Sequence, residues 1–203
     1  MNVIHIVKQR RREMNPEGKR VAIMAVGERL FARKGYAGTS IADIAKAAGV
    51  AVGSVYRLFP DKSSLLAALH QRMEQRFVEV MRQAWMSVDA YEDKFRPLID
   101  AMLLEAERTQ EIMPLYNMTQ DLVGASDYMP GVQMMTAIEA LYGGGVEAGV
   151  FRALPPGILG PFAHAMVEGG MRAWMMDPTP IHRQKVASEL LIVFQKAFLR
   201  PSA

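Results

Sequence analysis

The 203-residue sequence contains no cysteine, and its four histidines are scattered along the chain without a close pair. The absence of thiols excludes disulfides, thiol catalysis and cysteine-based metal sites. The sequence also lacks a Gly-x-Ser-x-Gly turn and a glycine-rich phosphate loop, which many hydrolases and nucleotide-binding proteins carry. We therefore expect a protein that is not an enzyme and that holds no metal and no cofactor.

Long apolar segments are also missing. No run of eighteen apolar residues occurs, and the basic segment Lys8–Arg12 interrupts any signal-peptide core. We expect a cytoplasmic protein with no membrane partner. Strand-type alternation does not persist anywhere, no repeat of fixed length is visible, and apolar residues recur instead at helical spacing. The expected fold is all-α, with about nine helices.

Charge is distributed unevenly along the chain. Residues 1–62 hold 12 Lys/Arg and 5 Asp/Glu, a balance of +7, whereas residues 63–203 hold 12 Lys/Arg and 16 Asp/Glu, a balance of −4. A basic N-terminal part on an acidic remainder is typical of a nucleic-acid reader with a separate body that does not bind nucleic acid.

The pattern divides the chain into a basic N-terminal arm (1–16), a segment with a helix-turn-helix pattern (17–62) and a helical remainder (63–203), which the resemblance given below implies to be a ligand-binding and dimerisation domain. Gly143–Gly145 interrupts a helical pattern and predicts a kink, a close helix crossing or an early helix end. Helices are expected at about 17–34, as a short pair between Thr39 and Phe59, and at about 61–88, 94–109, 112–122, 130–148, 158–176 and 181–199.

The short helix pair is the most informative motif. Thr39 is placed to cap the first helix, Ile41 and Ile44 form its apolar stripe, and Gly49 ends it where a left-handed residue is needed. A second short helix then runs to Phe59, before Pro60. The arrangement is that of a helix-turn-helix, which places its second helix in the DNA major groove, although an ordinary helical hairpin has the same local pattern.

The segment from Gly35 to Leu66 resembles the N-terminal signature of the TetR-type transcriptional regulators. This resemblance implies an all-α protein with a three-helix DNA-binding head, a ligand cavity among the body helices, and a dimer. The matching elements are Phe31–Tyr36, Thr39–Ile41, Asp43–Ala45, Ala48–Val50, Gly53–Tyr56, Phe59 and Lys62–Leu65.

The second helix of the pair is the expected reader of double-stranded DNA. The residues at its start have small side chains, which lets the backbone approach the groove wall. Arg57 can reach a phosphate or a guanine edge. The resemblance implies that Thr39, Tyr56 and Lys62 touch phosphates, and Leu58 stands where many relatives carry a His or Tyr. The predicted DNA-binding residues are Thr39, Ser40, Ala51, Val52, Gly53, Ser54, Tyr56, Arg57 and Lys62. The segment Lys8–Arg12 is either a minor-groove arm or a solubilising tail.

The C-terminal part holds 13 of the 16 methionines, which fill irregular space and adapt to varied shapes. Such a composition fits either a packed core or a pocket for a small hydrophobic ligand, and the resemblance implies the pocket. Glu105 shares a helix face with Leu98 and Met102 and needs a partner, either Arg172, a water or a cationic ligand. The predicted ligand-binding residues are Trp85, Leu98, Met102, Glu105, Tyr116, Met134, Phe162 and Met166.

The last two predicted helices are more apolar than one monomer of this size needs, with Leu190 and Phe194 among the residues expected at a subunit interface. We therefore expect a homodimer joined through these helices and bound to a palindromic operator. The predicted function is a transcriptional repressor that a small hydrophobic molecule releases from DNA. The alternative is a regulator of the same fold that a protein partner controls, or an activator, with no small-molecule inducer.

Overall fold

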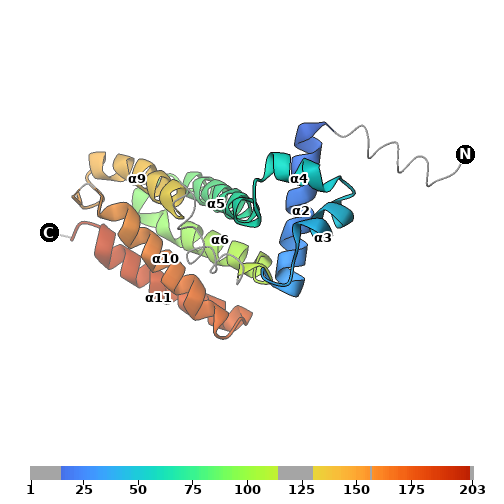
Figure 1. Cartoon of the computed structure of the whole chain (residues 1–203). Helices are drawn as coiled ribbons and strands as arrows, with labels where there is room; N and C mark the ends of the chain where they lie inside the picture. Colours follow the sequence, from blue (N-terminus) through green and yellow to red (C-terminus); the bar gives the residue numbers. More distant parts are fainter. Residues whose placement is uncertain (1–14, 114–129, 156, 202–203) are drawn as a thin grey trace, which may run out of the picture. The chain divides into compact units, whose positions relative to one another are not determined.

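A computed structural model describes residues 15–113, 130–155 and 157–201. In these ranges the chain forms eight α-helices and one short 3-10 helix, and the all-α prediction is confirmed (Figure 1). Residues 1–14 of the arm predicted at 1–16, Tyr116 and most of the helix expected at 112–122 lie outside the described residues, while Pro16 belongs to the first helix. The elements are α2 (Pro16–Lys34), α3 (Ile41–Ala48), α4 (Val52–Leu58), α5 (Lys62–Met86), η1 (Tyr91–Asp93), α6 (Phe95–Arg108), α9 (Val132–Glu147), α10 (Leu159–Met175) and α11 (Pro180–Phe198).

The chain divides into two compact units, and α5 contributes to both, because the boundary falls between Gln71 and Arg72. We call the described residues 15–71 and 111–113 the head, and the described residues 72–110, 130–155 and 157–201 the body. Among the described residues, no helix combines the length and apolar character needed to cross a membrane.

The head is a small helical domain whose helices begin and end at ordinary signals. Asn15 caps α2 by accepting a hydrogen bond from the Gly18 N–H at 2.7 Å, and Pro16 occupies the first turn. Gly35 ends α2 with a φ of 76°, a conformation that favours glycine. The buried core of the head is mainly apolar, with Thr39 and His70 as buried polar residues, and its apolar part contains Ile23, Phe31, Ile44, Val55, Phe59, Leu65, Leu66 and Leu69.

The body is a bundle in which α10 lies beside α9 and α11, and α6 packs on both α10 and α11 (Figure 1). Lys94 caps the C-terminal end of α5, because its Nζ donates to the carbonyls of Trp85 and Val88. The core next to this cap is aromatic: Phe151 stacks on Phe95 and on Tyr142 at centroid distances of 5.2 and 4.8 Å.

The glycine run at 143–145 does not break its helix, because α9 continues to Glu147. The early helix end, one of the three expected outcomes, is therefore wrong, and two of the glycines instead admit aromatic side chains. A Cβ at Gly145 would overlap the Phe151 ring, and one at Gly144 would overlap the Tyr91 hydroxyl. Small residues at these two positions let the aromatic core approach the α9 backbone.

Two residues expected at the subunit interface instead build the core of their own protomer. Phe194 is buried between Phe95 and Phe198, and the Leu190 side chain fills the space that Gly170 leaves on α10. The prediction that the Phe194 side chain faces a second subunit is therefore wrong, whereas Leu190 is half-buried. The outward apolar residues of α10 and α11 are different ones, and they include Phe162, Met176, Ile181, Ile192 and Val193.

Candidate nucleic-acid interface

The helix pair α3–α4 begins with a capping box. Ser40 Oγ accepts from the Asp43 N–H at 3.1 Å, and the Asp43 carboxylate accepts from the Ser40 N–H and hydroxyl. The expected cap, Thr39, is therefore wrong by one residue. The hydrogen bonds from Ser40 lower the pKa of Asp43, so this carboxylate is ionised at neutral pH and favours the positive end of the α3 dipole.

Thr39 points into the head rather than along the helix. Its side chain is 1% exposed, and its hydroxyl donates to the carbonyls of Gly35 at 2.9 Å and Leu30 at 3.2 Å. These bonds tie the loop before α3 to the end of α2. The hydroxyl that lies at the surface at this helix start is that of Ser40.

Lys62 reaches the same loop from the start of α5. Its ammonium donates to the carbonyls of Tyr36 at 2.7 Å and Thr39 at 3.0 Å, and it lies 4.2 Å from the centre of the Tyr36 ring. The neighbouring Asp61 caps α5, and the bonds from the Ser64 N–H and from the Ser63 and Ser64 hydroxyls lower its pKa. Lys62 therefore stabilises the loop before α3, whether or not it also contacts DNA.

The turn between the two helices is sharp and is fixed by Gly49. This residue has a φ of 71° and a left-handed conformation, and its N–H and that of Val50 close the end of α3. Val55 and Phe59 anchor α4 in the head core, and the Arg20 guanidinium lies 4.8 Å from the centre of the Phe59 ring. This anchoring turns the opposite side of α4 outward.

The outward side of α4 presents an apolar, a small, an aromatic and a basic residue at the surface: Val52, Gly53, Tyr56 and Arg57. An ideal Cβ built on Gly53 would meet nothing within 4 Å. Packing within the described chain therefore does not require glycine at this position, in contrast to Gly145.

An open hollow of about 530 Å³ lies between the outward side of α4 and the start of α3. Its lining brings together five of the nine residues predicted to bind DNA, namely Thr39, Ser40, Val52, Tyr56 and Lys62. The other four, Ala51, Gly53, Ser54 and Arg57, belong to α4 or its N-cap and do not line the hollow. The role of Lys62 in holding this surface was missed, because its partners are backbone carbonyls of the loop before α3.

In the body, most of the residues predicted to bind a ligand belong to one buried cluster. Trp85, Leu98, Met102 and Met134 are members, and Met166 packs against it. Phe162 does not join them, since it is 62% exposed on the outer side of α10.

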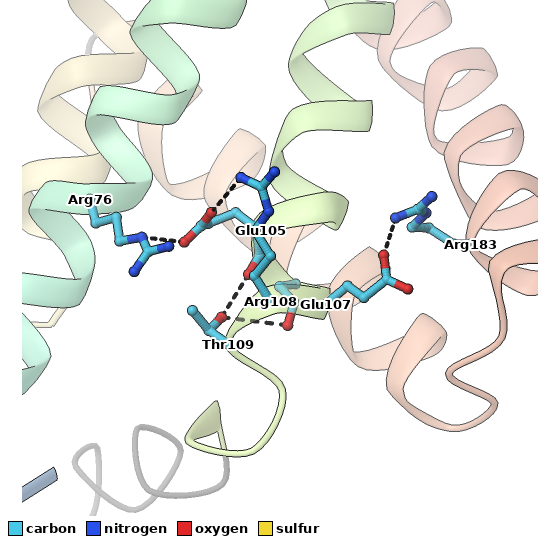
Figure 2. Close-up of polar contacts among 7 residues, drawn as sticks. Arg76, Glu105, Glu107, Arg108, Thr109 and Arg183 are labelled. Carbon is cyan, nitrogen blue, oxygen red and sulfur yellow. Dashed lines mark hydrogen bonds and ion pairs between the residues drawn. The ribbon is translucent and has the colours of Figure 1, made fainter. Parts of the chain in front are cut away.

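Glu105 is buried as expected, with 2% of its side chain exposed, but its expected partner is wrong. Arg172 is exposed, and Glu105 instead forms an ion pair with Arg76 of α5 and lies 3.8 Å from Arg108 on its own helix (Figure 2). Arg76 fits better because α5 lies against the apolar face of α6 on which Glu105 projects.

Glu107, two residues after Glu105, points to the other side of α6 (Figure 2). Glu107 pairs with Arg183 of α11, and the Thr109 hydroxyl donates to the carbonyls of Glu105 and Ala106 at the helix end (Figure 2). The last turn of α6 is therefore tied to α5 on one side and to α11 on the other. Among the described residues, no group of three or more His, Cys, Asp or Glu side chains is arranged to hold a metal ion.

The paired helices, the αL turn at Gly49 and the outward side of α4 define the head as a helix-turn-helix DNA-binding domain. Residues 23–69 match the family described as bacterial regulatory proteins, tetR family. The head is thus similar to the DNA-binding domain of the TetR-type transcriptional regulators.

Individual relatives agree with this assignment. The HTH-type transcriptional regulator AcrR of Shigella flexneri is 37% identical over 71 residues, which are 35% of this chain and a third (33%) of that relative. A TetR-family transcriptional regulator from Pectobacterium atrosepticum has a TM-score of 0.71 at 20% identity, covering 92% of this chain and 97% of its own.

A third relative is NalD, the secondary repressor of the MexAB-OprM multidrug efflux pump in Pseudomonas aeruginosa. It has a TM-score of 0.60 at 22% identity, covering 93% of this chain and 100% of its own. At these identities the two structures show a shared fold.

Proposed function

We propose that this chain is a dimeric repressor that reads a palindromic operator through α4 and leaves it when a small hydrophobic molecule binds the body. The observation that carries the proposal is the outward side of α4, where Gly53 has open space around it and Tyr56 and Arg57 flank it at the surface. A helix of this length with a small residue at its start can approach a groove wall closely. Such a regulator acts in the cytoplasm.

Each DNA contact follows from the chemistry of this surface. Tyr56 carries a hydroxyl at the hollow and donates it to a phosphate, while Val52 offers its methyls to a thymine methyl. Ser40 lies at the same hollow, and its hydroxyl donates to Asp43 within the capping box. Arg57 is exposed beside them and takes a phosphate or a guanine edge. Lys62 adds a positive charge close to the same backbone phosphates even while it holds the loop. Thr39 donates its N–H to the Tyr36 carbonyl and its hydroxyl to Gly35 and Leu30, so it positions the loop and does not donate to a phosphate.

The dimer forms through the outer side of α10 and α11. Residues 162, 165, 169, 173 and 176 repeat at helical spacing along α10 and are Phe, Ala, Gly, Ala and Met, all exposed in the single protomer. Gly169 has no neighbour within 4 Å of an ideal Cβ, so a second helix can approach here. Exposed apolar residues in such a row mark an interface, and a two-fold axis through it pairs two α4 helices on two half-sites.

The regulatory step uses α5, which belongs to the head at one end and to the body at the other. A ligand that enters the methionine-rich cluster moves α5 in the body and with it the position of α4 in each protomer. A coupling free energy of about 1–3 kcal/mol between ligand and DNA suffices for such a switch. The repressor NalD, which has the same fold, supports the sign of the regulation.

The experiment is a fluorescence-anisotropy titration with operator fragments selected from the host's genomic DNA. Arg57→Ala should weaken binding by about 1–3 kcal/mol if it reads a base, or lower the salt slope by about one unit if it contacts a phosphate. Arg96→Ala is the matched control, because Arg96 lies in the body and pairs with Asp100. Equal effects of the two substitutions would contradict the assignment of α4 as the reader.

A further inference from the structure

One buried donor in the body has no acceptor. The Trp174 side chain is 0% exposed in the last turn of α10, and no described residue accepts a hydrogen bond from its indole Nε1–H. A buried N–H without an acceptor loses its hydrogen bonds to water and receives nothing in return. Native proteins retain such groups rarely, and a missing partner molecule is one common reason.

The position of Trp174 points to the missing partner. It belongs to the same buried cluster as Trp85, Leu98, Met102 and Met134. Its neighbour on the preceding turn of α10, Met171, is flexible and packs against the cluster, while Leu190 fills the space beside Gly170. Methionine side chains move aside at low cost, so a guest molecule can enter the cluster beside the indole.

Two polar contacts link the helices around Trp174, and neither of them involves its indole N–H. His182 Nε2 lies 3.1 Å from the Ala173 carbonyl, which links α11 to the last turn of α10. Arg183 pairs with Glu107 and so links the same start of α11 to the end of α6 (Figure 2). The end of the core that contains Trp174 is therefore also the end at which α6 carries Glu105.

The charged side chains at this end of the body core do not favour a cationic ligand. Two carboxylates are buried in the body: the Arg76 and Arg108 guanidiniums already face Glu105, and Glu74 accepts from the Gly131 N–H. An internal ion pair cancels the preference for a positive ligand that an unpartnered carboxylate would have. What the cluster still offers is one neutral donor in an apolar surrounding.

We propose that the Trp174 Nε1–H is the polar anchor of the body's ligand site, and that the ligand is an uncharged apolar molecule carrying a hydrogen-bond acceptor, such as a ketone, ester or amide oxygen. The proposal rests on the proposed function, because it specifies the ligand of that same site. It assigns a chemical class where the methionine-rich cluster alone assigns only hydrophobicity.

The test uses two probes with one carbon skeleton: propiophenone, which carries a ketone oxygen, and propylbenzene, which has a methylene in its place. In calorimetry with the full-length protein the ketone should bind about three- to tenfold more tightly than the hydrocarbon. Trp174→Phe removes the N–H and keeps an aromatic ring, so the two probes should then bind equally. Arg96→Ala, on the body surface outside the cluster, is the control and should keep the difference.

A measurement on the unaltered protein guards against a variant that fails to fold. The chain has two tryptophans, so its ¹H–¹⁵N spectrum contains two indole signals, and Trp85→Phe assigns them. Propiophenone should shift the Trp174 signal downfield and propylbenzene should not. Equal binding of the probes, no binding, or an unmoved indole signal would overturn the proposal. Failure of the proposed function would appear separately, as absent operator binding by the ligand-free protein.

Discussion

The loop before α3 depends on one ammonium group, which makes Lys62→Met an informative change. Methionine keeps the length of the side chain but donates no hydrogen bond to the carbonyls of Tyr36 and Thr39, which Lys62 reaches at 2.7 and 3.0 Å. Hydrogen bonds from a charged donor contribute about 1.5–3 kcal/mol each, and the contact with the Tyr36 ring about 0.5–1 kcal/mol more. Because Lys62 is only partly buried, we expect the head to lose about 2–4 kcal/mol of unfolding free energy.

Urea unfolding followed by circular dichroism, with hydrogen exchange of the α3 amides, measures this loss. The matched control is Lys46→Met, since Lys46 is exposed in the last turn of α3 and its removal should cost about 0.5 kcal/mol or less. If Lys62→Met unfolds like the control and leaves α3 exchange unchanged, the ammonium does not hold the loop. Operator titrations then separate the two roles: a lost phosphate contact lowers the salt slope by about 0.9, whereas a loosened loop lowers affinity at an unchanged slope.

Three further changes test other parts of the structure. Gly53→Ala should raise the free energy of unfolding of the head by up to about 1 kcal/mol in urea titrations, because the added Cβ meets no neighbouring atom. The same substitution should weaken operator binding in anisotropy, and unchanged binding would argue against a close approach of α4 to the groove. Phe162→Lys with Ile192→Lys should give a monomer in sedimentation, while Met86→Lys, an equally exposed apolar site on α5, should remain dimeric; a dimer in both cases would place the interface elsewhere. Asp43 and Asp61 have lowered pKa values in the folded head, so these caps stabilise the head fully above the ordinary carboxyl pKa and lose this contribution as the pH falls through the lowered values. Asp61→Asn should therefore flatten the acid dependence of the melting temperature, and an unchanged profile would refute the assignment.

The helices and the turn of the head could be predicted because their signals are local. Apolar spacing defines each helix, Gly49 marks the turn, and the described helices begin and end within a few residues of the expected positions. The cap was misplaced from Ser40 to Thr39, since two adjacent hydroxyl residues offer the same local signal and only the buried environment of Thr39 distinguishes them.

The remaining differences come from contacts between distant residues. Lys62 binds carbonyls 23 and 26 residues away, and backbone acceptors leave no trace in side-chain patterns. Arg76 rather than Arg172 pairs with Glu105, a choice that depends on how α5 packs on α6. Phe162 and Phe194 both lie on apolar helices, and only the packed bundle shows which of them faces outward.

A hydroxyl-radical footprint of the ligand-free protein on its selected operator tests the central claim most directly. A dimer reading through two α4 helices should protect two patches related by a dyad, with centres about 10–10.5 base pairs or a multiple apart. Arg57→Ala should weaken both patches together. A single unsymmetrical patch, or protection that does not depend on sequence, would contradict the account of this chain as a dimeric operator-binding repressor.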